Sequence, residues 1–252
     1  RFLREARVTA MLQHPNTIPI YELSRDRRGH YFFTMKLVEG YTLREVLDIA
    51  EAEGTQAVDG YGFHRMVTIL IQVANALDYA HSHGVVHRDV KPANLLMGPF
   101  GEVLLLDWGL AKVWSEEPED VPEMPLLLDS DPSLTAQGKL QGTAHYMSPE
   151  QIESSRALDH RSDVYSMGAV LYEILAGRTT FEGDKVDTIL NQVKTVRPPP
   201  PSEVAPDREI PEQLEEIVMR CIEKDPDRRI QSARQLVAAL RSWRLRWAAA
   251  TS

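Results

Sequence analysis

The segment His87 to Asn94 (HRDVKPAN) constrains the fold more than any other part of the chain, because it crowds charged and amide side chains into a short loop. Thirteen residues after Asn94 comes Asp107, followed by Trp108 and Gly109. Taken alone, Asp89 would most often be a solvated turn residue after a helix. The interpretation therefore depends on the spacing between Asp89, Lys91, Asn94 and Asp107. Asp107 ends an apolar run, where a charge is unfavourable unless a metal ion or a partner compensates it. The pattern predicts a cleft in which these groups converge.

Helix and strand patterns around this segment support the convergence. Phe63 to His83 carries an apolar stripe at helical spacing, which predicts a long buried helix, and Gly84 follows at the position of a C-cap. Leu95 to Met97 and Val103 to Leu106 are short apolar runs around a glycine-bounded turn, and they predict a β-hairpin. A hairpin would return the acid at its end to the polar loop. Such a group could orient a hydroxyl and hold Mg²⁺ against phosphates, as phosphoryl transfer requires.

The N-terminal part of the chain predicts a helix and two strands. Apolar residues recur at helical spacing from Arg1 to Gln13, and the sequence His-Pro-Asn ends that pattern. Ile18 to Ser24 and His30 to Val38 read as strands joined by a polar turn. Another short helix is expected to begin at Leu43.

After the predicted hairpin the pattern changes twice. Ser115 to Asp131 (SEEPEDVPEMPLLLDSD) holds seven acidic residues and no basic one, lacks periodicity and predicts a loop. Helices are expected again from Asp159, from Pro211, where a first turn tolerates proline, and after Ser232, which favours an N-cap. Between them, Arg197 to Pro206 (RPPPPSEVAP) predicts an extended connector.

Composition narrows the functional classes. A formal net charge of −9 argues against a nucleic-acid-binding protein, whose surface should be basic. The single cysteine, Cys221, excludes an intrachain disulfide and fits a reducing compartment. No apolar run approaches the roughly 20 residues of a membrane span, no secretory signal is present, and the start at Arg1 suggests a fragment. We expect a cytoplasmic domain, or the cytosolic part of a longer, membrane-anchored protein.

With these motifs in this order, the sequence resembles the protein kinase superfamily, and specifically the eukaryotic-like Ser/Thr kinases of bacteria. HRDVKPAN is similar to the catalytic loop of that family, DWG at Asp107 to its metal-binding DFG motif, and SPE at Ser148 to its APE motif. The resemblance extends from the first predicted helix to Leu240. Several motifs in the right order and spacing are far more specific than one short motif.

The resemblance implies an α+β, two-lobe fold. A partial small β lobe would occupy residues 1–38, a complete and mainly helical large lobe residues 39–243, and a tail residues 244–252. The sequence has no GxGxxG motif, and its first lysine, Lys36, falls in the segment that resembles the nucleotide-binding hinge. We therefore expect the glycine-rich loop, the ATP-binding lysine and the first small-lobe strands to be missing from this chain.

The resemblance also implies a role for each polar residue of the loop. Asp89 would be the base that accepts the substrate hydroxyl proton, and Lys91 would steady the γ-phosphate of ATP. Asn94 and Asp107 would hold Mg²⁺. Thr143, in the sequence GTAHY, would hydrogen-bond near Asp89 and Lys91 and help to place a Ser or Thr hydroxyl.

Five further residues are implied in nucleotide binding. Glu5 matches the glutamate that pairs with the ATP-contacting lysine, and a solvated surface carboxylate is the alternative. Met35, Lys36 and Val38 lie in the hinge-like segment, whose backbone would bind adenine. Leu96 matches the residue beneath the adenine ring, a role that is compatible with simple core packing.

Other residues are expected to be structural. The resemblance pairs Glu150 with Arg229 in a buried ion pair and makes Asp163 the residue that tethers the backbone of the catalytic loop. Trp108 would fill the slot that phenylalanine usually occupies. Cys221 lies on the apolar stripe of its predicted helix and reads as core.

Protein substrates with Ser or Thr acceptors are the expected partners. Regulation is expected through phosphorylation of the loop between DWG and SPE, with Thr135 and then Ser133 as candidate autophosphorylation sites. Arg88 is the residue that would pair with a loop phosphate.

Two alternatives stay open. A non-catalytic, pseudokinase-like scaffold is favoured by the missing lysine but has no need of Asp89, Lys91, Asn94 and Asp107 in a cleft. A small-molecule phosphotransferase is disfavoured by GTAHYMSPE, which resembles a protein-substrate docking segment.

Overall fold

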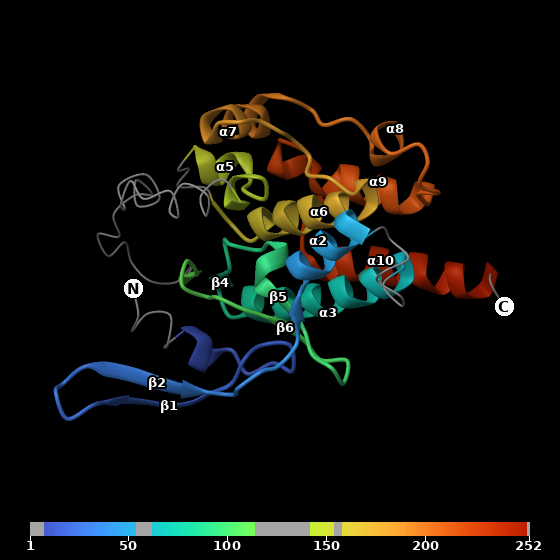
Figure 1. Ribbon diagram of the computed structural model, residues 1–252. Coiled ribbons are helices and arrows are strands. Elements are labelled where there is room, and N and C mark those ends of the chain that lie inside the picture. The colour runs from blue at the N-terminus through green and yellow to red at the C-terminus, as the bar shows by residue number, and fades with distance from the viewer. Residues whose placement is uncertain (1–7, 54–61, 114–141, 154–157, 251–252) are drawn as a thin grey trace.

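A computed structural model describes residues 8–53, 62–113, 142–153 and 158–250 (Figure 1). Within these residues, no helix is long and apolar enough to span a membrane. In chain order the elements are β1 (Ile20–Arg25), β2 (Tyr31–Met35), β3 (Tyr41–Thr42), α2 (Leu43–Glu53), α3 (Phe63–Ser82), β4 (Val85–Val86), η2 (Pro92–Asn94), β5 (Leu95–Met97), β6 (Val103–Leu105), β7 (Lys112–Val113), α5 (Pro149–Ile152), α6 (Arg161–Ala176), α7 (Val186–Thr195), α8 (Pro201–Val204), α9 (Glu212–Cys221), η3 (Pro226–Arg228) and α10 (Ala233–Ala250).

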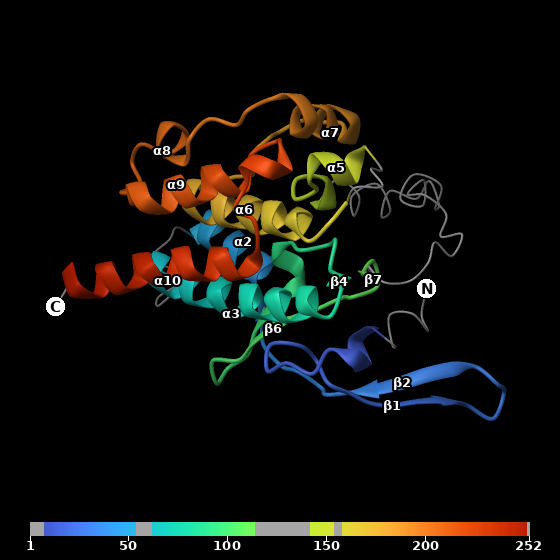
Figure 2. The ribbon, with the colours of Figure 1, turned by 180° about the vertical axis from the view of Figure 1, so that it is seen from behind.

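Helix α6 lies inside the helical body. Every residue from Ser162 to Ala176 is buried, because small and apolar side chains cover most of the helix circumference. α3 and α9 pack against it, and α10 runs alongside α3 (Figures 1 and 2). A helix that is apolar on all sides needs neighbours on all sides. α6 is therefore the element around which the other helices are arranged.

The contact between α6 and α9 is made at a glycine. A Cβ atom added to Gly168 would lie 2.4 Å from the Cβ of Cys221 and 2.9 Å from Cγ2 of Ile222. The missing side chain lets α9 approach α6 closely, and Cys221 is fully buried there, as its sequence position predicts. Burial raises the pKa of the Cys221 thiol to about 12.

A three-stranded antiparallel sheet, in the order β3-β5-β6, contains the predicted hairpin. Tyr41 of β3 pairs with Met97 of β5. Gly40 precedes β3 with a φ of +146°, and a Cβ atom there would fall 2.1 Å from the carbonyl oxygen of Met97, so only glycine fits. After the hairpin, the N–H of Leu106 donates to the carbonyl of Asn94 at 2.8 Å. The chain beyond β6 thus returns to the end of the loop His87 to Asn94.

β1 and β2 form a separate antiparallel ribbon that projects from the helical body (Figures 1 and 2). Leu23 pairs with Phe33, and the guanidinium of Arg25 lies 4.0 Å from the centroid of the Tyr31 ring. Both predicted strands are confirmed. The second strand ends at Met35, three residues earlier than the sequence predicted.

The helices expected from Asp159, from Pro211 and after Ser232 are present as α6, α9 and α10. Ser232 caps α10, because its Oγ accepts the N–H of Gln235 at 3.1 Å. α10 then continues to Ala250, through most of the expected tail of residues 244–252. The ring of Trp243 is buried, and the exposed ring of Trp247 lies 5.5 Å from it, one turn further along the helix.

The segment Arg197 to Pro206 is not extended throughout, as the sequence predicted. It contains one helical turn, α8, which begins at Pro201. Proline suits the first turn of a helix, because no N–H donor is needed there. At the other end of the chain, residues 8–11 are helical, and the rest of the predicted first helix up to residue 7 lies outside the described residues.

We expect Gly168→Ala to lower the free energy of unfolding by roughly 1–3 kcal/mol, the usual cost of overpacking a core. Urea unfolding followed by circular dichroism measures this change. The control is Ala238→Ser, which also adds one atom to a helix but at an exposed position, and should cost less than about 0.5 kcal/mol. Equal stability of Gly168→Ala and the unsubstituted chain would contradict the close approach of α6 and α9.

Candidate active site

The loop His87 to Asn94, the candidate catalytic loop, is held by Asp163, at the start of α6. Oδ2 of Asp163 accepts the backbone N–H of His87 at 2.9 Å, and Oδ1 accepts that of Arg88 at 2.8 Å. Nε2 of His81, on α3, lies 2.7 Å from Oδ2 of the same carboxylate. The predicted tether is therefore confirmed. His81 is a partner that the sequence analysis did not identify.

The carboxyl group of Asp163 is fully buried. Burial alone would raise its pKa, but the hydrogen bond from His81, the charge interactions with His81 and His87 and the N–H of Arg88 together lower the pKa below its ordinary value. Asp163 is therefore ionised and can only accept hydrogen bonds, so Nε2 of His81 is the donor.

Arg88 has an unusual backbone conformation for a residue with a side chain. Its φ is +71°, in the left-handed region. Such a conformation costs on the order of 1–3 kcal/mol and persists only where surrounding contacts impose it. The hydrogen bond from its N–H to Asp163 is one such contact, and the strained residue directly precedes Asp89.

Asp89, Lys91, Asn94 and Thr143 come together in one cluster. Nζ of Lys91 donates to both carboxylate oxygens of Asp89, at 2.9 and 2.8 Å, and to Oγ1 of Thr143 at 2.9 Å. Nδ2 of Asn94 donates to the carbonyl of Asp89 at 2.7 Å and to its Oδ2 at 3.1 Å. The convergence predicted from the loop is present, and it includes the predicted contact of Thr143.

Asp107 follows β6, with an exposed carboxylate and a left-handed φ of +59°. Its Oδ1 accepts the N–H of Gly109 at 3.1 Å. The residues on either side of it contact the catalytic loop, because Nε2 of His87 lies 3.0 Å from the carbonyl oxygen of Leu106, and Trp108 packs edge-on against the His87 ring at 4.5 Å. Trp108 is buried, as expected of a residue that fills an apolar slot.

The donor set fits a divalent cation. Asn94 commits its amide nitrogen to Asp89, so its amide oxygen is the atom that can act as a ligand. Asp107 presents its carboxylate at the end of the same hairpin. Carboxylate and amide oxygens are the hard ligands that Mg²⁺ prefers. A bound Mg²⁺ would supply positive charge that neutralises phosphate oxygens.

The hinge-like segment lies at and after the end of β2. Met35 is 51% exposed and Val38 is half-buried. The N–H of Lys36 donates to the carbonyl of Pro19 at 3.2 Å. That N–H is therefore already engaged and is not a donor for a ligand in this conformation.

Leu96 is half-buried and pairs with Leu104 across the hairpin, an arrangement that is compatible with both of its expected roles. The remaining predicted residues, Glu5, Ser133 and Thr135, lie outside the described residues.

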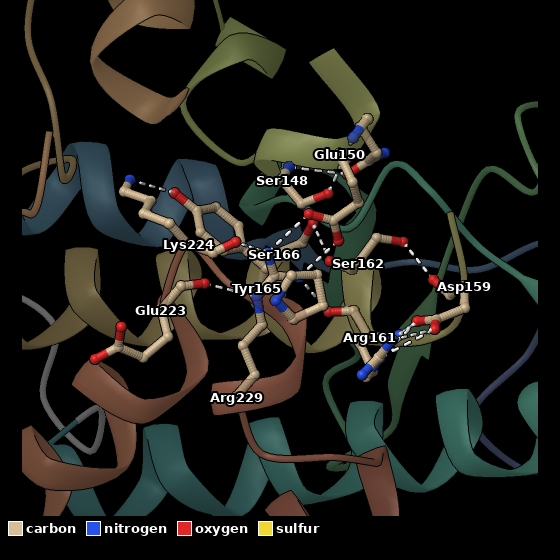
Figure 3. A network of polar contacts seen from close by, with 12 residues as sticks. Ser148, Glu150, Asp159, Arg161, Ser162, Tyr165, Ser166, Glu223, Lys224 and Arg229 are labelled. Atoms are coloured by element: carbon tan, nitrogen blue, oxygen red, sulfur yellow. Dashed lines mark hydrogen bonds and ion pairs between the residues drawn. The ribbon is translucent and has the colours of Figure 1, made fainter. Parts of the chain in front are cut away.

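Glu150 and Arg229 form the predicted buried ion pair, shown in Figure 3. Two parallel hydrogen bonds of 2.6 and 2.7 Å join the guanidinium to the carboxylate. Arg229 also donates to the carbonyls of Glu223 and Lys224, at 2.7 and 3.0 Å. Removing one partner of such a pair costs roughly 3–5 kcal/mol, because the other charge stays buried and alone. The pair fixes α5, which follows the segment that carries Thr143.

Lys224, beside this pair, is a residue that the sequence analysis missed. Its Nζ lies 4.6 Å from the centroid of the Phe181 ring. It also lies 3.4 Å from the hydroxyl of Tyr165 (Figure 3). Burial lowers the pKa of Lys224 to about 8, and the charge of Arg229 adds to this effect, while Glu223 opposes it. A lysine in a polar stretch of sequence gives no sign of such an environment.

Glu173 of α6 is a second residue that was missed. Its carboxylate accepts the hydroxyl of Tyr146 and the guanidinium of Arg44, both at 2.6 Å, and only 6% of its side chain is exposed. Burial raises the pKa of the Tyr146 phenol, and the neighbouring Glu173 charge raises it further. An acid within an otherwise apolar helix pattern is the signal that could have identified Glu173, because a buried charge requires partners.

Comparisons with known proteins give the class of this fold and site. The family model described as the protein kinase domain matches residues 1–240. The chain belongs to the protein kinase domain family. Its mixed fold, mostly helical with small sheets, is the two-lobe fold of that family.

Similar proteins include three bacterial kinases. Serine/threonine-protein kinase PknD of Protochlamydia amoebophila is 35% identical over 250 residues, which cover 96% of this chain and 25% of the relative. Serine/threonine-protein kinase pkn3 of Myxococcus xanthus is 35% identical, covering 96% of this chain and 41% of the relative. Serine/threonine-protein kinase PknB of Mycolicibacterium smegmatis is 35% identical, covering 95% of this chain and 35% of the relative. The chain thus spans between 25% and 41% of the length of these relatives.

Lys224 gives a pH-dependent prediction. Between its folded-state pKa of about 8 and its ordinary value of 10.5, the unfolded chain binds a proton that the folded chain does not, so raising the pH favours folding. We expect the stability of the unsubstituted chain relative to Lys224→Met to rise between about pH 7 and pH 10. Urea unfolding at several pH values measures this difference.

The control is Lys194→Met, at an exposed lysine of α7. Its stability difference from the unsubstituted chain should stay constant over the same pH range. A Lys224→Met difference that does not change with pH would show that Lys224 titrates normally in the folded chain.

Proposed function

We propose that this chain is the catalytic domain of a Ser/Thr protein kinase, which transfers the γ-phosphate of ATP to Ser or Thr hydroxyls of proteins. The observation that carries the proposal is the cluster of Asp89, Lys91, Asn94 and Thr143, next to a hairpin that ends in Asp107. Membership of the protein kinase domain family supports it.

Asp89 is the proposed base. Its carboxylate is held by Lys91 and Asn94, which fixes its direction and leaves it able to accept the proton of a substrate hydroxyl. Lys91 is the proposed partner of the γ-phosphate. Thr143, which already binds Lys91, would place the acceptor hydroxyl. Phosphoryl transfer depends mainly on positioning and electrostatics, and this cluster can supply both.

Nucleotide binding is proposed for a second set of residues. Asn94 and Asp107 would hold Mg²⁺ against the phosphates, as their oxygen atoms allow. The adenine would lie between Leu96 and the backbone of the hinge segment, which includes Met35, Lys36 and Val38. Glu5 would pair with a phosphate-contacting lysine.

A non-catalytic scaffold is the second candidate. The sequence contains no GxGxxG motif, and Lys36, its first lysine, follows β2. The groups that usually cover and orient the phosphates are therefore not identified among these residues, and we propose that transfer by residues 1–252 alone is weak. The polar cluster favours the enzyme, because a scaffold gains nothing from burying Asp89, Asn94 and Thr143 together.

We expect Asp107→Ala to abolish Mg²⁺-dependent nucleotide binding, because it removes the carboxylate ligand. Asp89→Asn should keep that binding and lower the rate of phosphate transfer by at least about a hundredfold, as expected for loss of a catalytic base. Titration with a fluorescent ATP analogue, with and without Mg²⁺, separates the two effects.

Asp184→Ala is a suitable control, since Asp184 is an exposed acid between α6 and α7. It should bind and react like the unsubstituted chain. Tight Mg·ATP binding by Asp107→Ala would refute the metal assignment, and binding without any phosphate transfer would favour the scaffold.

We propose further that phosphorylation of Thr135, or else Ser133, regulates the enzyme through Arg88. A phosphate adds about −1.5 to −2 charges and strong acceptor oxygens, which an arginine of the catalytic loop can bind. Mass spectrometry of the active protein should locate phosphate at one of the two residues. Full activity of a Ser133→Ala/Thr135→Ala double variant would contradict this regulation.

A further inference from the structure

The backbone of Arg88 is held on both sides of its Cα atom. Its N–H donates to Asp163 of α6 at 2.8 Å. Its carbonyl accepts a hydrogen bond of 2.8 Å from Nε2 of Gln151, on α5. Because the φ of Arg88 is left-handed, contacts at both ends are needed to hold a conformation that most side-chain-bearing residues avoid.

Gln151 uses both ends of its side-chain amide. Oε1 accepts the backbone N–H of Ser148 at 3.0 Å, and Nε2 donates to Arg88. The two partners fix the orientation of the amide, because a backbone N–H only donates and a carbonyl only accepts. Gln151 is 3% exposed. One buried side chain thus caps α5 and binds the catalytic loop.

α5 is itself firmly placed. Oγ of Ser148 accepts the N–H of Gln151 at 3.4 Å, which completes a capping box. The buried pair of Glu150 and Arg229 anchors the same turn to the helical body. Gln151 therefore extends from a fixed element to the residue that precedes Asp89.

We propose that Gln151 is a positioning residue, which holds the Arg88 carbonyl so that Asp89 keeps its catalytic orientation. The expected effect on rate rests on the proposed function. The hydrogen bond between Gln151 and Arg88 is independent of that function. The same segment reaches the catalytic loop a second time, where Thr143 binds Lys91. Gln151 is thus a further link between the segment that includes Thr143 and the loop that carries Asp89.

Two substitutions separate the bond from Gln151 to Arg88 from the side-chain cap of α5. Gln151→Glu keeps an oxygen that can accept the N–H of Ser148 but loses the donor to Arg88. Ser148→Ala removes the Oγ cap and keeps the amide and its bond to Arg88. We expect Gln151→Glu to lower kcat about tenfold with KM for ATP unchanged, the size expected when a buried hydrogen bond is lost and its partner left unpaired. Ser148→Ala should keep kcat within about twofold.

The pH profile of Gln151→Glu gives a readout that general destabilisation would not. A protonated carboxyl group can donate to the Arg88 carbonyl, and an ionised one cannot. We therefore expect kcat of Gln151→Glu, divided by that of the unsubstituted chain at the same pH, to rise as the pH falls. The division removes the contributions of the titratable neighbours that both proteins share, including Asp89, Asp163, His81 and His87.

Hydrogen exchange of the Arg88 and Asp89 amides, measured by NMR without nucleotide, tests the contact independently of activity. Both amides should exchange about tenfold faster in Gln151→Glu than in Ser148→Ala. Unchanged exchange in Gln151→Glu, or an equal loss of kcat in both variants, would overturn the proposal. If the unsubstituted chain transfers no phosphate, the proposed function fails, and the exchange rates still decide whether Gln151 holds the loop.

Discussion

The site depends on a buried charge, the carboxylate of Asp163, and on the donors that make its burial possible. An ionised carboxylate without partners would be too costly inside α6. Two of its donors are backbone N–H groups of the catalytic loop, and the third is the imidazole of His81. Packing of α3 against α6 therefore also fixes the position of the loop. His87 then extends this order to the residues around Asp107, through its ring contacts with Leu106 and Trp108.

Two other buried carboxylates, those of Glu173 and Glu150, are also stabilised by hydrogen-bond donors from other segments. Glu173 of α6 holds Tyr146 and Arg44, and Glu150 of α5 holds Arg229. Each of these buried acids ties an irregular segment to a helix. Irregular backbone lacks the hydrogen-bond ladder of a helix or strand, so side chains must supply the partners that fix its course. The helices hold these acids in fixed positions. The hydrogen bonds of the acids then fix the loops that carry the polar cluster.

The sequence predicted most of the helices, the hairpin and the convergence of Asp89, Lys91 and Asn94, because these follow from apolar periodicity and from spacing along one short loop. It did not predict His81, Gln151, Glu173 or Lys224. Each of these residues contacts a residue that is distant in the sequence, and these contacts form only when the helices pack together. The roles of Glu5, Thr135 and Ser133 stay predictions.

The close contact between α6 and α9 at Gly168 makes Cys221 a probe for the separation of these two helices. Cys221 is its only thiol, is fully buried against Gly168, and has a pKa raised by burial. A thiol reagent needs an exposed thiolate, so modification must wait until the two helices separate. The rate of labelling by such a reagent therefore reports the opening of the helical core alone, without interference from fluctuations of the ribbon or of the loops.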